Sequence, residues 1–246
     1  MMRFGFQTSL ACAALAVATA ASAADLPTSK PAPRAPVPVA TLYDWSGFYV
    51  GGYAGGSFGT ASFRDLSFPA FTGVGDLSPT SFTGGVINGY NFQFNSFVAG
   101  AEIEFGYDGR NASGSYQVAP GLRGSRNDSI DGDYVGRLRA RAGYAFDNML
   151  VFAAGGLSIG DLEAKFVNPN NGYNQSIAQN LIGFNVGAGA EYAFARNWIA
   201  RVEYIYDDFG SRGYSFNITP PNGGLFDSQK IRLTENTVRA ALEYKF

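Results

Sequence analysis

Alternation of apolar and polar residues with a period of two runs along most of the chain beyond residue 43, and it constrains the fold more than any other feature. In residues 133–146 the odd positions start at Asp133 and include three arginines, whereas the even positions are all Tyr, Gly, Leu, Ala or Phe. Successive side chains of a β-strand point to opposite faces, so this pattern predicts a strand with one polar and one apolar face. The same split occurs in residues 97–108, 182–194, 198–207 and 237–246.

Short and long connections alternate between these segments. Asn95-Ser96, Asp147-Asn148 and Arg196-Asn197 have the length and composition of tight turns. The other linkers are expected to be long: residues 59–80, 109–131, 164–178 and 211–231. Three short turns and four long loops join eight strands, with further strands at 45–58, 81–94 and 149–163. The layout predicts an all-β fold, an eight-stranded antiparallel up-and-down transmembrane β-barrel with short periplasmic turns and four long extracellular loops.

The apolar face of such a barrel is expected to face lipid and not an internal core. Bulky aromatic residues lie near both ends of the apolar faces: Tyr134 with Phe146, Phe97 with Tyr107, and Tyr192 with Phe194. These positions match the aromatic girdles of outer-membrane barrels. The polar faces combine glycine and alanine with charges of both signs, which suits a narrow lumen. A soluble barrel with its apolar side inward is the disfavoured alternative. For the strands at residues 45–58 and 149–163, the pattern does not show which face points outward.

Charged residues on the polar faces are expected to form a network inside the lumen. The candidates are Glu102, Glu104, Arg137, Arg139, Arg141, Glu191, Arg201, Glu203, Arg239 and Glu243, with Lys245 beside them. An eight-stranded barrel has an interior just wide enough for side chains, so these groups should pair and fill it. The alternative is that the same charges line a pore for small solutes.

The N-terminal residues predict export from the cytoplasm. Arg3 precedes an apolar stretch over residues 4–20, and Ala21-Ser22-Ala23 has the pattern of a signal-peptidase site. We therefore expect residues 1–23 to be a signal peptide, residues 24–42 a proline-rich periplasmic tail, and residues 43–246 the barrel. The single cysteine, Cys12, lies in the signal peptide, so no disulfide is expected in the mature chain.

The composition excludes several classes of function. The chain has no histidine, which removes the usual general base and the usual metal ligand. Glu102 and Glu104 could be read as paired carboxylates, but the nearby arginines should neutralise them, so we expect neither an enzyme nor a cofactor or metal site. A net charge of −2 without a basic tail gives no sign of nucleic-acid binding.

Two motifs resemble a known family. Residues 45–52, Trp-Ser-Gly-Phe-Tyr-Val-Gly-Gly, are similar to the opening strand of the small outer-membrane barrels of alphaproteobacteria, the porin-opacity type related in shape to the OmpA membrane domain. The C-terminal Leu242, Tyr244 and Phe246 resemble the signal that the barrel-assembly machinery recognises. The resemblance implies an abundant surface protein that stabilises the envelope and holds lipopolysaccharide. We separately expect the barrel to be a monomer. The start Ala24-Asp25 is similar to that of relatives joined covalently to peptidoglycan.

The loops leave open a further function, binding of haemin or of host surfaces. Aromatic residues and arginines occur in the predicted loops: Phe63, Phe68, Phe71, Tyr173, Tyr214 and Phe226, with Arg110, Arg123 and Arg126. Haemin ligation would have to use tyrosine or methionine, because histidine is absent. This hypothesis stands beside the structural and porin hypotheses.

Overall fold

The computed structural model describes residues 43–65, 76–117, 125–168, 173–218 and 225–246. The predicted signal peptide and proline-rich tail, with Ala24 and Asp25, lie outside these residues, as do Phe68, Phe71 and Arg123 of the expected loops. No helix that could cross a membrane occurs in the described part of the chain.

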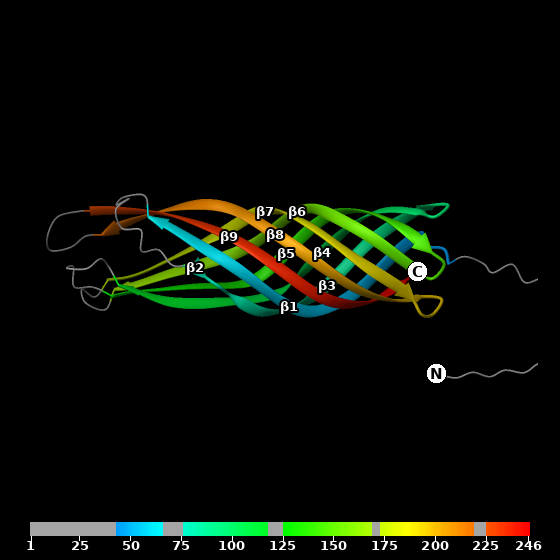
Figure 1. Cartoon of the computed structure of the whole chain (residues 1–246), viewed down its shortest axis with the longest axis horizontal. Helices are drawn as coiled ribbons and strands as arrows, with labels where there is room; N and C mark the ends of the chain where they lie inside the picture. Colours follow the sequence, from blue (N-terminus) through cyan, green and yellow to red (C-terminus); the bar gives the residue numbers. More distant parts are fainter. Residues whose placement is uncertain (1–42, 66–75, 118–124, 169–172, 219–224) are drawn as a thin grey trace, which may run out of the picture. The chain divides into compact units, whose positions relative to one another are not determined.

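The described residues form β-strands joined in one sheet. The strands are β1 (Gly47–Asp65), β2 (Asp76–Leu77), β3 (Thr80–Phe94), β4 (Phe97–Gln117), β5 (Ser125–Phe146), β6 (Met149–Asn168), β7 (Tyr173–Ala193), β8 (Trp198–Ile218) and β9 (Leu225–Lys245). Each long strand pairs antiparallel with its neighbour, and β1 pairs with β9, which closes the sheet into a barrel (Figure 1). The short β2 pairs with β1 beyond the end of β3. The expected eight-stranded barrel is confirmed.

Two of the predicted tight turns occur where expected. Asn95 and Asp147 begin the connections from β3 to β4 and from β5 to β6, and both adopt the left-handed backbone conformation, with φ of 56° and 52°. Asn and Asp tolerate this conformation better than other non-glycine residues. The third connection spans residues 194–197 and includes the predicted Arg196-Asn197. We call this end of the barrel the turn end and the opposite end the loop end.

The expected bounds of the long loops are wrong. Strand β4 continues to Gln117 and β5 resumes at Ser125, so most of the expected linker 109–131 is paired strand. The expected linkers 164–178 and 211–231 are likewise mostly strand. These segments show little apolar alternation because their outer face can meet water beyond the membrane. Their backbone hydrogen bonds form whatever the polarity of the side chains.

The barrel wall divides into two sheets toward the loop end. Pairing of β7 with β8 stops at Phe184 and Asp208, and pairing of β3 with β4 stops at Thr83 and Asp108. Beyond these points β4 to β7 stay paired as one sheet, and β8, β9, β1 and β2 as another. The two groups of strands are visible at the left of Figure 1.

The inward face predicted for Asp133 is wrong, because β5 contains a bulge. The register with β6 shifts between Asp131 and Val135, and the side chain of Asp133 is exposed instead of pointing inward with the arginines. Asp161 stabilises the bulge, because its Oδ1 accepts hydrogen bonds of 3.0 Å from the backbone N–H groups of Asp133 and Tyr134. An added residue in one strand breaks the period-two frame, so alternation counted through it assigns the wrong face.

Apolar residues close the interior at both ends of the barrel. The turn-end collar consists of Trp45, Val98, Ala145, Leu150, Ala193 and Ile199. The loop-end collar consists of Ala61, Leu77, Ile130, Leu162, Ala164, Leu181, Phe209, Ile231 and Leu233. All of these side chains are buried. The interior is therefore layered, with charged residues between two apolar collars.

The outer surface carries the lipid-facing residues. Large apolar side chains such as Ile103, Leu138 and Val202 are more than half exposed. Aromatic rings gather at the turn end, where Tyr244 lies 5.3 Å from Trp198 and 5.2 Å from Phe246 between ring centroids. This arrangement matches an interfacial aromatic girdle, as expected for a transmembrane barrel.

Candidate functional site

The candidate site is the charged middle layer of the interior. Five strands supply it because inward positions recur at every second residue of β4, β5, β7, β8 and β9. The ten charged residues expected in the lumen all lie there, each at most 4% exposed: Glu102, Glu104, Arg137, Arg139, Arg141, Glu191, Arg201, Glu203, Arg239 and Glu243. The structure brings all ten into one connected network of ion pairs.

Arg239 and Arg139 form the centre of this network. The Arg239 guanidinium donates to Glu104 Oε2 at 2.7 Å and to Glu203 Oε2 at 2.6 Å. Arg139 Nη1 lies 2.9 Å from Glu104 Oε1 and 2.9 Å from Glu102 Oε1. Arg139 Nη2 also contacts Glu203 Oε1 on β8. Each of these two arginines therefore bridges carboxylates from different strands, which is the arrangement that can compensate charges removed from water.

Arg201 and Arg141 extend the network toward the turn end. Arg201 Nε lies 2.7 Å from Glu243 Oε1 and 2.8 Å from Glu191 Oε1. Arg141 Nη2 donates to the same Glu191 oxygen at 2.7 Å. Its guanidinium carbon also stands 4.1 Å from the centre of the Phe152 ring, a cation–π distance.

Tyr49 joins the two parts of the network. Its hydroxyl donates to Glu102 Oε2 at 2.9 Å and accepts from Arg141 Nη1 at 3.0 Å. The ring fits only because residue 89 is glycine: a Cβ there would stand 2.3 Å from the Tyr49 ring. Sequence reasoning did not include Tyr49, because the inward and outward faces of residues 45–58 were not assigned.

Further polar residues that the sequence analysis did not identify complete the layer toward the loop end. Arg137 Nη2 donates to Asp207 Oδ2 at 2.8 Å, and Asn185 donates to Ser158 Oγ at 2.9 Å. Arg110, which was expected in a loop, is buried, and its Nη1 lies 3.5 Å from Glu235 Oε2. Continuing the polar parity of each strand by a few residues would have found Asp207, Glu235 and Arg110.

Lys245 and the C-terminal residues lie at the edge of the site. Lys245 is half-buried at the turn end, where its Nζ stands 5.4 Å from the centre of the Tyr43 ring. Leu242 and Phe246 face outward, with 48% and 68% of their surface exposed, and Tyr244 packs with Phe246 in the girdle. Their role as an assembly signal stays a prediction.

The described part of the chain contains no group of His, Cys, Asp and Glu side chains that could hold a metal ion. The ten network residues are ion-paired, so their main chemical property is mutual neutralisation inside a space with little water.

Comparisons with known proteins agree with this architecture. A model of the outer membrane protein beta-barrel domain matches residues 9–246. The chain is 36% identical over 250 residues to the 31 kDa outer-membrane immunogenic protein of Brucella melitensis, covering 96% of this chain and 98% of that one. It is 30% identical to the 22 kDa outer membrane protein of Rhizobium leguminosarum, over 80% of this chain and 79% of that one.

A solved structure shares the fold at low sequence identity. The outer membrane protease OmpT from Escherichia coli aligns with a TM-score of 0.51 and 8% identity, over 81% of this chain and 97% of that chain. With the closed antiparallel barrel, its aromatic girdle and the relatives named as outer-membrane proteins, these findings locate the protein in the outer membrane. The chain belongs to the family of the outer membrane protein β-barrel domain.

Proposed function

We propose that the protein is a structural barrel of the outer membrane, closed to solutes, that contributes to the integrity of the envelope and to its surface interactions. The observation that supports this proposal is the layered interior. The charged side chains of the network are 0–1% exposed, so the middle layer holds little water. Apolar collars lie above and below it, which disfavours the passage of an ion.

The same layer argues against catalysis in the interior. A general acid or base must reach its substrate within hydrogen-bond distance. Glu102 and Glu104 are each 2% exposed and contact arginines on several sides, so no substrate can approach their carboxylates. The likeness to a protease barrel concerns the fold alone. We therefore propose that the chain is not an enzyme.

Planar-bilayer recording tests the closed interior. We expect refolded barrel, shown to be folded by a heat-modifiable band on a gel, to give no steady conductance steps. A general porin refolded and recorded in parallel controls for insertion. Reproducible steps that change when Arg139 is replaced by alanine would show that the charged layer conducts, and would support the alternative of a small-solute porin.

Loop-mediated binding of haemin or host surfaces keeps less support. Of the residues that motivated it, Arg110 has a described side chain, and that side chain is buried against Glu235 and not displayed in a loop. The side chains of Phe63, Tyr173, Tyr214, Phe226 and Arg126 lie outside the described part of the structure. We propose instead that the surface interactions are with lipopolysaccharide. We also propose that the barrel-assembly machinery inserts the barrel and that the barrel is a monomer.

We also propose that the N-terminus tethers the barrel to peptidoglycan. The support is the start Ala24-Asp25 and the proline-rich spacer before the first strand. Sacculi boiled in detergent, washed and digested should release peptides of this chain. A variant with Asp25→Ala and an unchanged signal sequence should fold equally well yet leave no such peptides. Absence of chain peptides from wild-type sacculi would refute the tether.

A further inference from the structure

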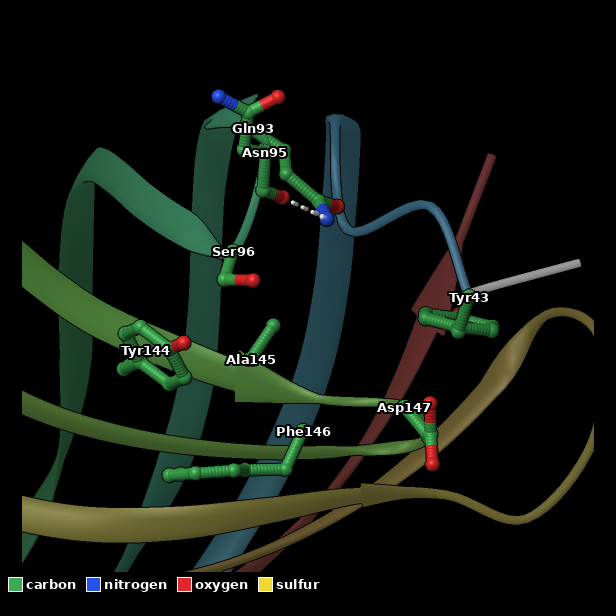
Figure 2. Close-up of a pocket in the computed structure, with 8 residues that line it drawn as sticks. All are labelled: Tyr43, Gln93, Asn95, Ser96, Tyr144, Ala145, Phe146 and Asp147. Carbon is green, nitrogen blue, oxygen red and sulfur yellow. Dashed lines mark hydrogen bonds between the residues drawn. The ribbon is translucent and has the colours of Figure 1, made fainter.

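The loop end of the barrel leaves one edge of β7 without a partner strand. At the turn end the wall is paired up to the tight turns, where Gln93 Nε2 donates to Asn95 O at 2.7 Å (Figure 2). At the loop end the pairing of β7 with β8 stops at Phe184 and Asp208, whereas β7 stays paired with β6 to its first residue. Within the described part of the chain, residues 173–183 therefore have a neighbouring strand on one side only. We call their unpaired side the free edge.

The even-numbered residues of β7 direct their backbone groups toward the free edge. Ala193 donates its backbone N–H to Asn148 O, on the β6 side, at 2.8 Å. Backbone groups point alternately to the two sides of a strand, and the β6–β7 register runs without a shift along both strands. The odd-numbered residues therefore bond to β6. The N–H and C=O groups of the even-numbered residues from 174 to 182 point to the side where β8 no longer pairs.

The free edge lacks the features that usually protect a strand edge from further pairing, which are charges, prolines and bulges. Residues 173–190 contain no charged residue and no proline, and their pairing with β6 has no bulge. The facing edge of β8 differs, because its register with β9 shifts between Asp208 and Ser211 and it carries the exposed Arg212. Strand β4 also has a register shift where its pairing with β3 ends. The free edge of β7 is therefore the best suited to accept another strand.

The free edge lies beyond the apolar band of the outer surface and has two chemically different faces. Ile182, 59% exposed, is the last large apolar residue on the outward face of β7 toward the loop end. On the inward face, Leu181 belongs to the loop-end collar and Ile177 packs against it. The outward residues beyond Ile182 are exposed, small and neutral: Asn174, Ser176, Ala178 and Asn180. An added strand would place apolar residues beside the inward face and small polar residues beside the outward face.

We propose that the free edge of β7 binds an extended segment of another protein at the cell surface, by β-strand addition. The segment pairs antiparallel to β7, which is the more stable pairing, and bonds to the backbone groups of residues 174–182. It is uncharged and alternates apolar with small polar residues, because the free edge offers no charge to pair with. This partner goes beyond the proposed function, since it is a protein and not lipopolysaccharide.

Binding of synthetic peptides to the refolded barrel in lipid nanodiscs tests the proposal. The probe is a fluorescent peptide of about ten residues in which valine and threonine alternate. The control peptide has the same sequence with its amide nitrogens methylated, so it cannot donate hydrogen bonds. We expect saturable binding of the probe by fluorescence anisotropy and at least about tenfold weaker binding of the control peptide. No binding of the probe, or equal binding of the two peptides, would overturn the proposal.

Hydrogen exchange followed by NMR locates the bound peptide. The N–H groups of Ser176, Ala178 and Asn180 should exchange rapidly in the free barrel and at least about tenfold more slowly with the probe bound. Those of Ile177 and Gln179 bond to β6 and should be protected in both states. Slow exchange at the even-numbered residues of the peptide-free barrel would mean that a second copy or another segment of the chain already covers the edge, and would overturn the proposal. Protection gained on β8 and not on β7 would also overturn it.

Ala178→Pro removes one donor from the free edge. Proline is tolerated in an edge strand where its nitrogen faces away from the ladder, so the heat-modifiable band should be unchanged. We expect at least about tenfold weaker binding of the probe, because proline removes the N–H and blocks close approach. The matched control, Ala178→Thr, keeps the donor and should bind within about twofold of wild type. Undiminished binding by folded Ala178→Pro would overturn the proposal, and the conductance test of the closed barrel is unaffected by either result.

Discussion

Arg239→Met is expected to lower the free energy of unfolding by about 3–5 kcal/mol, the usual cost of removing one partner from a buried ion network. The Arg239 guanidinium contacts both Glu104 and Glu203, and all three side chains are 0% exposed. Methionine keeps much of the volume but leaves two carboxylates short of a compensating charge. Urea unfolding of the barrel in lipid vesicles, followed by the heat-modifiable band, measures the change.

The matched control for this prediction is Arg232→Met. Arg232 also forms an ion pair, at 2.6 Å to Asp208, but its side chain is 57% exposed. Solvent screens such a pair, so the expected loss is below about 1 kcal/mol. Equal losses in the two variants would mean that burial of the network does not determine its contribution to stability.

Trp45→Ala is the second change with a large expected effect, again about 3–5 kcal/mol. Trp45 is 0% exposed within the turn-end collar, although it comes from the residues before β1 and not from a barrel strand. Its indole N–H lies 3.4 Å from the carbonyl oxygen of Asp147, and its ring centroid is 4.9 Å from that of Tyr43. Alanine leaves a cavity that the surrounding barrel wall cannot collapse to fill. The same unfolding measurement in vesicles applies.

Trp198→Ala serves as the comparison, because Trp198 is 42% exposed in the girdle and contacts Tyr244 on the outer surface. Lipid can occupy the space left by this ring, so a distinctly smaller loss is expected than for Trp45. A loss for Trp45→Ala no greater than that for Trp198→Ala would show that the ring does not hold the turn end closed.

The sequence alone predicted the strand number, the closure and the inward charged residues. These depend on local signals: the alternation in residues 97–108 and 133–146, and the Asn95 and Asp147 turns. A period of two specifies which side chains share a face wherever no bulge interrupts the strand. For the same reason, the ten charged residues could be found before any pairing between strands was known.

The remaining features depend on contacts between distant parts of the chain. The apolar collars were not predicted, because their inward residues, such as Leu150 and Ile199, are apolar like the outward residues beside them. Alternation of polar and apolar residues therefore does not mark the inward face at these positions. Burial of Arg110 beside Glu235 requires that β4 and β9 meet across the interior, 125 residues apart in sequence. The two-sheet loop end depends on where the β7–β8 and β3–β4 pairings stop, which no residue type marks.

The ion pairs that cross the barrel interior have a consequence for the order of folding. Arg239 on β9 binds Glu104 on β4, and Arg137 on β5 binds Asp207 on β8, so the bonds join strands that are not neighbours in the wall. Hairpins can form early from adjacent strands, but these bonds form only when the circle of strands is complete. Any intermediate with an open seam would hold unmatched charges in the bilayer, which is costly. Opening the finished barrel must pass through the same state, so its persistence in the membrane is set by a high unfolding barrier and not only by equilibrium stability.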